Sequence, residues 1–319
     1  NETVKKLNLK NSYILEIASN DGTFLKPYKN NGHHVLGVDP AKNICTLANN
    51  NGINTLNEFF NNELVDSNPN LENSFDLVIA RNVLPHVKHL HSIIRGIKRT
   101  LKKKGFCVVE FHNARTILKE LHYDSIYHEH LYYFSLTTLT NLFKNYNLFP
   151  FDLSHSPISG GSWIIYFGNE NNNKSRVLLE ELKKEKIEKI NSLETWQDFS
   201  EKTKNHSLSL NKKLSEFNGK IIGYGASARS STLLNFCNID NDKIDFIVDK
   251  NELKSNHYTP GSNIIIKSPK YLEQNIDGVD LILILAWNFR DEIIKELKEI
   301  GYSGSVLIPF PEKVSIYEI

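Results

Sequence analysis

The sequence is poor in cysteine. Its 319 residues include only Cys45, Cys107 and Cys237, which are too far apart to form a disulfide framework or a Cys-x-x-Cys zinc site. We therefore exclude the disulfide-rich secreted class and the zinc-ribbon class. This scarcity fits a protein of the reducing cytoplasm, which is the location we expect.

An excess of one charge is also missing, as is any long hydrophobic run. Lysine and arginine total 38 against 37 aspartate and glutamate residues, so no strong overall field attracts nucleic acid or an anionic membrane. The longest apolar run, around residues 281–287, is far below the ~20 residues that span a bilayer. No secretory signal peptide is visible at the N-terminus. We expect neither nucleic acid nor a membrane as a partner.

Apolar runs of strand length alternate with helical stretches in the first half of the chain. Strands are predicted at 13–18, 34–38, 75–80 and 106–111, and helices at 23–30, 42–50 and 89–101. Because these strands are continuously apolar and separated by helices, they predict a parallel sheet that is covered on both faces.

The last third of the chain repeats this rhythm with a different sequence. Strands are predicted at 220–224, 243–248, 280–286 and 305–309, and helices at 231–236 and 291–300. Between the two parts, residues 174–218 are charged and have leucines at helical spacing, which predicts one or two helices. The predicted fold is therefore α/β, with domains at 1–170 and 219–319 joined by a helical linker at 171–218.

The first strand–helix junction has residues typical of a ligand-binding sheet edge. Ligands of open parallel sheets bind outside the carboxyl ends of the strands, and a glycine there lets the backbone approach closely. The carboxylate of Asp21 would repel a phosphate but not a cationic sulfonium with an amino group. Asp39 lies at the end of the second strand, where its carboxylate can accept hydrogen bonds from both hydroxyls of a ribose. The pattern predicts an S-adenosylmethionine (SAM) site, with a plain turn and helix cap as the alternative. The residues predicted to bind SAM are Ala18, Ser19, Asn20, Asp21, Gly22, Asp39, Pro40 and Asn82.

His86 follows the strand at 75–80 in the stretch RNVLPHV. It is expected in the same crevice as Asn82, where it could contact the cofactor or the acceptor. A loop histidine without a catalytic role is the alternative.

The stretch Tyr127-His128-Glu129-His130 places four groups that can hold or transfer protons in one tetrapeptide. A metal site is one interpretation, but the histidines lack the i, i+4 spacing of a zincin helix and no cysteine cluster assists them. Polar packing between the two halves is another. We predict no metal.

Two glycine-containing stretches could bring backbone N–H groups to a phosphate. The first, Gly160-Gly161-Ser162, could equally be a hairpin turn. The second, around Gly225, lies between a strand and a helix, where nicotinamide binding is the competing interpretation. The residues predicted to bind substrate are Gly160, Gly161, Ser162, Tyr224, Gly225, Ala226, Ser227 and Asn288.

Taken together, these stretches resemble the SAM-dependent sugar C-methyltransferases that act on nucleotide-linked keto-deoxysugars. The matching stretches run in order along nearly the whole chain, at 16–25 (EIASNDGTFL), 37–44, 81–87, 126–135 (IYHEHLYYFS), 158–162, 221–235, 258–264 and 286–289. The resemblance implies a Rossmann-like methyltransferase domain and a second Rossmann-like domain that helps to hold the nucleotide sugar. It also implies that Tyr127, Glu129 and His130 lie at the reacting carbon, with His130 as the base, and that His86 lies at the acceptor site.

The sequence departs from this family at two points. The family usually begins with a small cysteine-rich zinc domain, which is not found in this sequence. An arginine often follows the Gly-Gly-Ser stretch by two positions, whereas Ser162 is followed here by Trp163 and Ile164, so a charge that could meet a phosphate is lost.

The expected activity is C-methylation of a nucleotide-linked keto sugar next to its ketone, in deoxysugar or polysaccharide biosynthesis. An O-methyltransferase acting on a sugar or sugar phosphate remains an alternative, as do a non-catalytic nucleotide-sugar binder and an NAD-dependent dehydrogenase. No feature of the sequence indicates whether the protein is a monomer or an oligomer.

Overall fold

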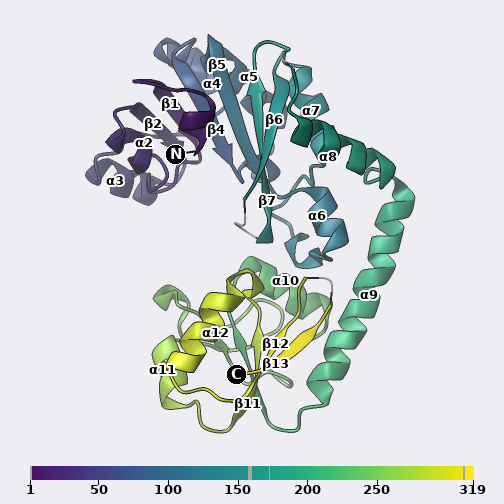
Figure 1. Ribbon diagram of the computed structural model, residues 1–319. Coiled ribbons are helices and arrows are strands. Elements are labelled where there is room, and N and C mark those ends of the chain that lie inside the picture. Colours follow the sequence, from purple (N-terminus) through teal and green to yellow (C-terminus); the bar gives the residue numbers. More distant parts are fainter. Residues whose placement is uncertain (1, 157–159, 172, 312) are drawn as a thin grey trace. The chain divides into compact units, whose positions relative to one another are not determined.

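The computed structural model describes residues 2–156, 160–171, 173–311 and 313–319. By its contacts the chain divides into two compact units (Figure 1). The N-terminal unit comprises Asn1–Ala114 and Leu131–Glu188, and the C-terminal unit comprises Arg115–His130 and Lys189–Ile319. The predicted domains are continuous segments of the chain, and the first of them, 1–170, includes residues 115–130. The units defined by contacts instead group residues 115–130 with the C-terminal part of the chain.

The N-terminal unit contains a seven-stranded sheet with the order β3-β2-β1-β4-β5-β7-β6. β1 to β5 are parallel, β7 is antiparallel to β5, and β6 is antiparallel to β7. The strands are β1 (Tyr13–Ile17), β2 (His34–Asp39), β3 (Thr55–Asn57), β4 (Phe75–Arg81), β5 (Leu101–Phe111), β6 (Phe149–Ser156) and β7 (Ser162–Gly168). The helices are α1 (Glu2–Lys6), α2 (Lys26–Asn30), α3 (Lys42–Asn50), α4 (Asn62–Ser67), α5 (Leu90–Thr100), α7 (Leu136–Lys144) and α8 (Arg176–Ile187).

The continuous apolar strands of this sheet are buried on both faces, as expected for parallel strands. On β1, Ile14 packs into one cluster with Leu25, Ala48 and Ile53. The next residue, Leu15, points to the other face and belongs to the larger cluster that contains residues of α5, α7 and α8. Burial on both faces leaves the ends of the strands as the places where polar side chains gather.

The C-terminal unit contains a six-stranded sheet with the order β10-β9-β8-β11-β12-β13, in which only β13 is antiparallel among the described strands. The strands are β8 (Lys220–Tyr224), β9 (Ile247–Val248), β10 (Ile266–Lys267), β11 (Val279–Ile284), β12 (Ser305–Ile308) and β13 (Ser315–Glu318). The helices are α6 (Ala114–Lys119), which begins at the boundary between the units, α9 (Leu193–Ser215), α10 (Ala228–Phe236), α11 (Pro269–Gln274) and α12 (Arg290–Glu299).

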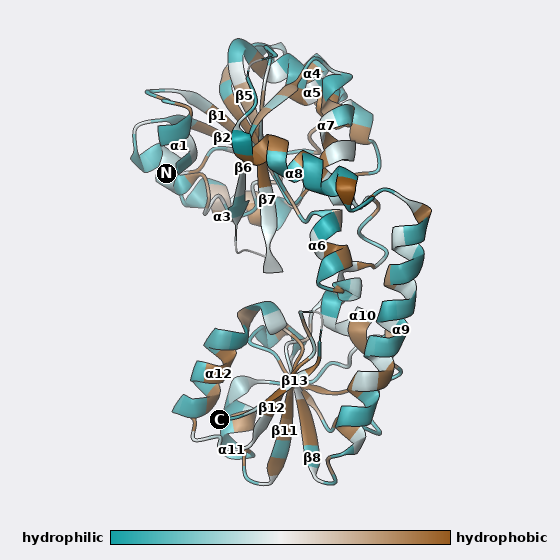
Figure 2. Ribbon diagram, turned by 45° about the vertical axis from the view of Figure 1, so that its right-hand side comes forward, coloured by the Kyte–Doolittle hydropathy of each residue, from teal (hydrophilic) through white to brown (hydrophobic). Residues whose placement is uncertain are grey.

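The long helix α9 is mainly hydrophilic, whereas most residues of β8 and β11 are hydrophobic (Figure 2). The helix buries one stripe at helical spacing, which includes Phe199, His206 and Leu210. The α/β class with two separate sheets is confirmed. Within the described ranges, no helix has both the length and the apolar composition that crossing a bilayer requires.

Candidate functional site

The predicted site residues fall into two groups, one in each unit. In the N-terminal unit, the chain leaves β1 through a sharp turn in which Ala18, Asn20 and Gly22 have φ values of +55°, +52° and +79°. A Cβ atom at Gly22 would lie 2.8 Å from the side chain of Ile53, so both the backbone angle and the space there require glycine.

Asp39, at the end of β2, fixes this turn. Its Oδ2 accepts a hydrogen bond from the backbone N–H of Asn20 at 3.0 Å, and its Oδ1 accepts one from the N–H of Ala41 at 2.9 Å. Each carboxylate oxygen still has a lone pair left for a further donor. The carboxylate, followed directly by Pro40, is therefore held in place and can accept hydroxyl groups of a ribose.

Two buried polar atoms beside this turn have no hydrogen-bond partner within the described structure. They are Oε2 of Glu16, the penultimate residue of β1, and Oγ of Ser19. The two residues are only 3% and 2% exposed. Because leaving such atoms unpaired costs free energy, they indicate a place for a ligand that carries its own donors, such as the ammonium group of SAM. The residues present at this edge thus fit SAM.

Glu16 lies in a charged cluster inside the sheet. Burial raises the pKa of its carboxyl to about 8, and Glu110 and Asp21 add to the rise, whereas the guanidinium of Arg81 opposes it. Arg81 Nε donates to Glu110 Oε2 at 2.8 Å. Glu16 is not among the residues that the sequence predicts to bind SAM, although an acidic residue within an otherwise apolar strand is a signal for such a site.

Asn82 and His86 follow β4 at the same edge of the sheet. Asn82 has a φ of +49°, and its N–H donates to the carbonyl of Glu110 at 2.8 Å. His86 ends the 3₁₀ helix η2 (Leu84–His86) and is exposed. The structure therefore keeps both residues on the carboxyl side of β4, where the sequence placed them.

The Gly-Gly-Ser stretch belongs to the same unit. Gly160 and Gly161 have φ values of +82° and +110°, and the buried Ser162 begins β7. Ile158 and Ser159, which belong to the matching sequence stretch, lie outside the described residues.

The tetrapeptide Tyr127 to His130 belongs to the C-terminal unit. His130 Nδ1 lies 2.6 Å from the carbonyl oxygen of Ser125. A carbonyl only accepts, so Nδ1 carries the proton, and in the neutral ring the basic atom is Nε2. The rings of Tyr127 and His130 are 4.3 Å apart between centroids. His128 and Glu129 are exposed. Across the parts of the chain described, no group of three or more His, Cys, Asp or Glu side chains could hold a metal ion.

The second glycine loop follows β8. Gly225 has a φ of +100°, and a Cβ there would lie 2.5 Å from that of Ala286. The N–H of Ala226 donates to Asp249 Oδ2 at 2.8 Å. Ser227 is the N-cap of α10 and accepts from the N–H of Ser230.

Tyr224 ends β8, and its hydroxyl donates to Glu296 Oε2 at 2.9 Å. Burial, reinforced by that carboxylate, raises the pKa of the Tyr224 phenol. Asn288 lies in the 3₁₀ helix η6 (Trp287–Phe289), shortly after β11. Because β8 and β11 are parallel neighbours, these predicted substrate residues lie at one edge of the second sheet.

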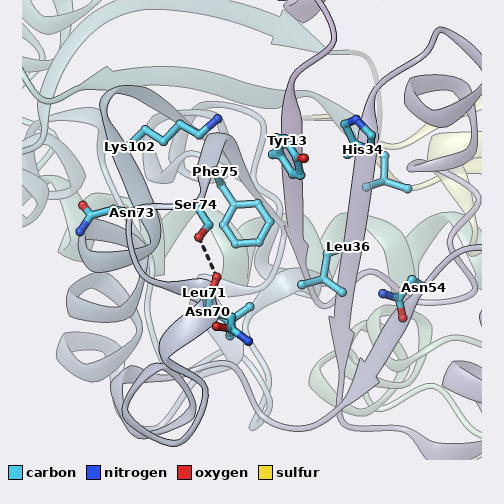
Figure 3. Close-up of a pocket in the computed structure, with 11 residues that line it drawn as sticks. Tyr13, His34, Leu36, Asn54, Asn70, Leu71, Asn73, Ser74, Phe75 and Lys102 are labelled. Carbon is cyan, nitrogen blue, oxygen red and sulfur yellow. Dashed lines mark hydrogen bonds between the residues drawn. The ribbon is translucent and has the colours of Figure 1, made fainter.

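A cavity of about 530 Å³ opens at the opposite edge of the first sheet (Figure 3). It is lined by residues at the starts of the parallel strands, among them Tyr13, His34 and Phe75. The rings of Tyr13 and His34 stack at 4.5 Å, and Lys102 lies over the Tyr13 ring. No predicted site residue lines this cavity, which is therefore separate from the carboxyl edge of the sheet.

Two known protein families match this chain, one in its first half and one in its second half. A family described as "Methyltransferase domain" matches residues 2–149, and one described as "C-methyltransferase C-terminal domain" matches residues 157–311. The C-methyltransferase NovU of Streptomyces niveus is 30% identical over 305 residues, which cover 94% of this chain and 72% of NovU.

Solved structures match about half of the chain. A SAM-dependent methyltransferase of Thermotoga maritima, described as a possible histamine N-methyltransferase, has 19% identity and a TM-score of 0.42, covering 53% of this chain and 86% of its own. A Burkholderia thailandensis 1,6-didemethyltoxoflavin-N1-methyltransferase with bound S-adenosylhomocysteine has 16% identity and a TM-score of 0.40, covering 52% of this chain and 73% of its own.

Proposed function

Because the chain belongs to the family of SAM-dependent sugar C-methyltransferases, we propose that it methylates a nucleotide-linked keto sugar at the carbon next to its ketone. The proposed base is His130. The proposed setting is deoxysugar or polysaccharide biosynthesis in the cytoplasm, which is consistent with three buried free cysteines.

The chemistry needs a base because a C–H bond next to a ketone is only weakly acidic. Removing the proton gives a carbanion that is delocalised onto the ketone oxygen as an enolate. Neutral imidazole is a competent proton acceptor near pH 7. The single observation that supports His130 most strongly is the hydrogen bond from its Nδ1 to Ser125, because it assigns Nε2 as the atom that takes the proton.

The other predicted catalytic residues have supporting roles in this proposal. Tyr127 donates a hydrogen bond to the developing enolate oxygen, and its ring is close to that of His130. Glu129 orients an imidazole, and His86 contacts the acceptor. The loop from Tyr224 to Ser227, together with Asn288, holds the nucleotide part of the substrate through backbone N–H groups. The Gly-Gly-Ser stretch of the N-terminal unit is a second proposed substrate-binding segment.

In the N-terminal unit, Asp39 would hold the ribose hydroxyls of SAM, and Glu16 would accept a hydrogen bond from its ammonium group. The turn at 18–22, with Asn82 and Pro40, shapes the rest of that site. Bound SAM supplies an electrophilic methyl group that the substrate carbon accepts. The residues that bind it therefore serve mainly to orient the methyl group and to exclude water.

The proposal is tested by incubating the protein with SAM and a set of nucleotide-linked keto-deoxysugars, followed by mass spectrometry and NMR of the product. A new methyl group bonded to carbon supports the proposal. A methyl group bonded to oxygen identifies an O-methyltransferase. Binding of the sugar nucleotide without any transfer identifies a binding protein, and calorimetric binding of NAD but not of SAM identifies a dehydrogenase.

A further inference from the structure

Asp124 is a buried carboxylate that the chemistry above does not use. It lies in the 3₁₀ helix η3 (Tyr123–Ser125), three residues before Tyr127, and is only 1% exposed. Ionised side chains are seldom buried to this extent unless they are paired and hydrogen-bonded. Its partners therefore show what the carboxylate holds together.

Two residues donate hydrogen bonds to Asp124, and each lies within two positions of a predicted substrate residue. Arg229 donates from Nε to Oδ2 and from Nη2 to Oδ1, both at 2.9 Å. Trp287 donates from Nε1 to Oδ2, also at 2.9 Å. Arg229 lies in the first turn of α10, just after Ser227, and Trp287 directly precedes Asn288.

This arrangement is rigid. A bidentate arginine–carboxylate pair fixes both groups in one plane, and the guanidinium of Arg229 also lies over the Trp287 ring, 4.9 Å from its centroid. The pair is largely buried, with side-chain exposures of 19% for Arg229 and 2% for Asp124. Removing one partner would leave an uncompensated buried charge.

Asp124 directly precedes the residue whose carbonyl group orients His130. The residue after Asp124 is Ser125, whose carbonyl oxygen accepts the hydrogen bond from His130 Nδ1. Ser125 is itself held by two hydrogen bonds to the carbonyl of His122, one from its N–H at 3.0 Å and one from its hydroxyl at 2.6 Å. A rotation of the Asp124 backbone would move this carbonyl and release the ring.

We propose that Asp124 is a positioning residue that links Arg229 and Trp287 to the orientation and tautomer of His130. This inference rests on the proposed role of His130 as the base. While the Ser125 carbonyl is in place, the neutral ring carries its proton on Nδ1 and accepts at Nε2. When the carbonyl moves, the other tautomer becomes accessible and the basic atom points elsewhere.

The test compares Asp124→Asn and Trp287→Phe with the control Asp280→Asn. Asp280 is in the same unit and also accepts a hydrogen bond, from the N–H of Lys220 at 2.8 Å, but it lies at the start of β11. The first readout is the pair of ¹⁵N chemical shifts of the His130 ring in histidine-labelled protein, assigned with His130→Ala. These shifts distinguish the two tautomers without any substrate.

We expect the Nδ1–H tautomer in the wild type and in Asp280→Asn, and a mixture of tautomers in Asp124→Asn and Trp287→Phe. We also expect kcat of Asp124→Asn to fall about 10- to 100-fold, the loss seen when partners that orient ligating histidines are removed, with KM for the sugar nucleotide nearly unchanged. Trp287→Phe removes one hydrogen bond to Asp124 but keeps the ion pair between Asp124 and Arg229. This variant therefore tests the positioning role if Asp124→Asn does not fold.

Wild-type tautomer shifts in the folded variants would overturn the positioning role, as would a wild-type ring protonated on Nε2. If the wild-type protein methylates no keto sugar, the proposed function fails. The ¹⁵N comparison still tests the link between Asp124 and His130 in that case, so the two failures can be distinguished.

Discussion

His130 donates from Nδ1 to the carbonyl oxygen of Ser125, and the two atoms are 2.6 Å apart. Because this contact is formed between residues five positions apart, the local fold of the tetrapeptide segment determines which ring nitrogen is basic.

Replacing His130 by alanine should abolish methyl transfer while SAM binding stays at the wild-type level. Loss of a general base costs about 10²- to 10⁴-fold in rate, and the residues proposed to bind SAM belong to the other unit. Turnover measured by mass spectrometry and SAM binding measured by calorimetry check both parts. The control is His128→Ala, which removes an exposed neighbouring imidazole and should retain most of the activity. Equal loss in both variants would contradict a specific role for His130.

Replacing Asp39 by asparagine should weaken SAM binding. The change removes the charge that holds the turn at Asn20 and that accepts the ribose hydroxyls, and hydrogen bonds to charged groups contribute about 1.5–3 kcal/mol, or roughly 10- to 100-fold in affinity. Calorimetric titration with SAM measures the effect. Asp76→Asn is the matched control, because Asp76 accepts from the N–H of Tyr13 at the opposite edge of the sheet. If the two variants bind SAM equally well, Asp39 has no role in the cofactor site.

Glu16 should make the protein less stable as the pH rises. Its native pKa is raised from 4.5 to about 8, so between these values the native state keeps a proton that the unfolded state has lost. The free energy of unfolding then falls with pH, by at most roughly 1.4 kcal/mol per pH unit, and levels off above pH 8.

Glu16→Gln removes this titration, so its free energy of unfolding should depend less on pH than that of the wild type. Urea unfolding followed by circular dichroism at several pH values between 5 and 8 measures both slopes. Parallel curves for the two proteins would show that the Glu16 carboxyl does not titrate with a raised pKa.

Replacing Gly225 by alanine should raise KM for the sugar nucleotide and destabilise the C-terminal unit. Its φ of +100° is unfavourable for any other residue, and the new Cβ would be 2.5 Å from Ala286. Gly301→Ala is the control, because Gly301 also has a positive φ, +83°, but no atom within 4 Å of the added Cβ. Thermal unfolding and steady-state kinetics should show a larger effect at Gly225. A larger or equal effect at Gly301 would contradict the assignment.

The sequence predicted the parts of the fold that depend on local patterns. Continuous apolar runs located β1, β2, β4 and β8 to within one residue at either end. The strand predicted at 243–248 is wrong at its start, because Lys243 and Ile244 form a turn with Asp240 and only Ile247–Val248 pairs in the sheet. Its apolar residues are buried whether or not they form a strand, and hydrophobicity alone does not distinguish the two cases.

The contacts of the candidate site depend on chain segments far apart, which local patterns do not reveal. Asp124 pairs with Arg229, more than one hundred residues away, and nothing near either residue signals the pairing. The same contacts explain why segment 115–130 is grouped with the C-terminal unit. The edge formed by Asp39, Asn20 and Gly22 could be predicted, because the strand ends of a parallel sheet place such residues together.

The most direct test of the account is deuterium incorporation at the carbon next to the ketone, measured by NMR in D₂O with a nucleotide-linked keto-deoxysugar and no SAM. The wild-type protein should catalyse the exchange and His130→Ala should not, because a base that removes this proton acts whether or not a methyl donor is bound. Wild-type protein that methylates the sugar but leaves this C–H bond unexchanged, or exchange at the same rate in His130→Ala, would contradict the proposed mechanism.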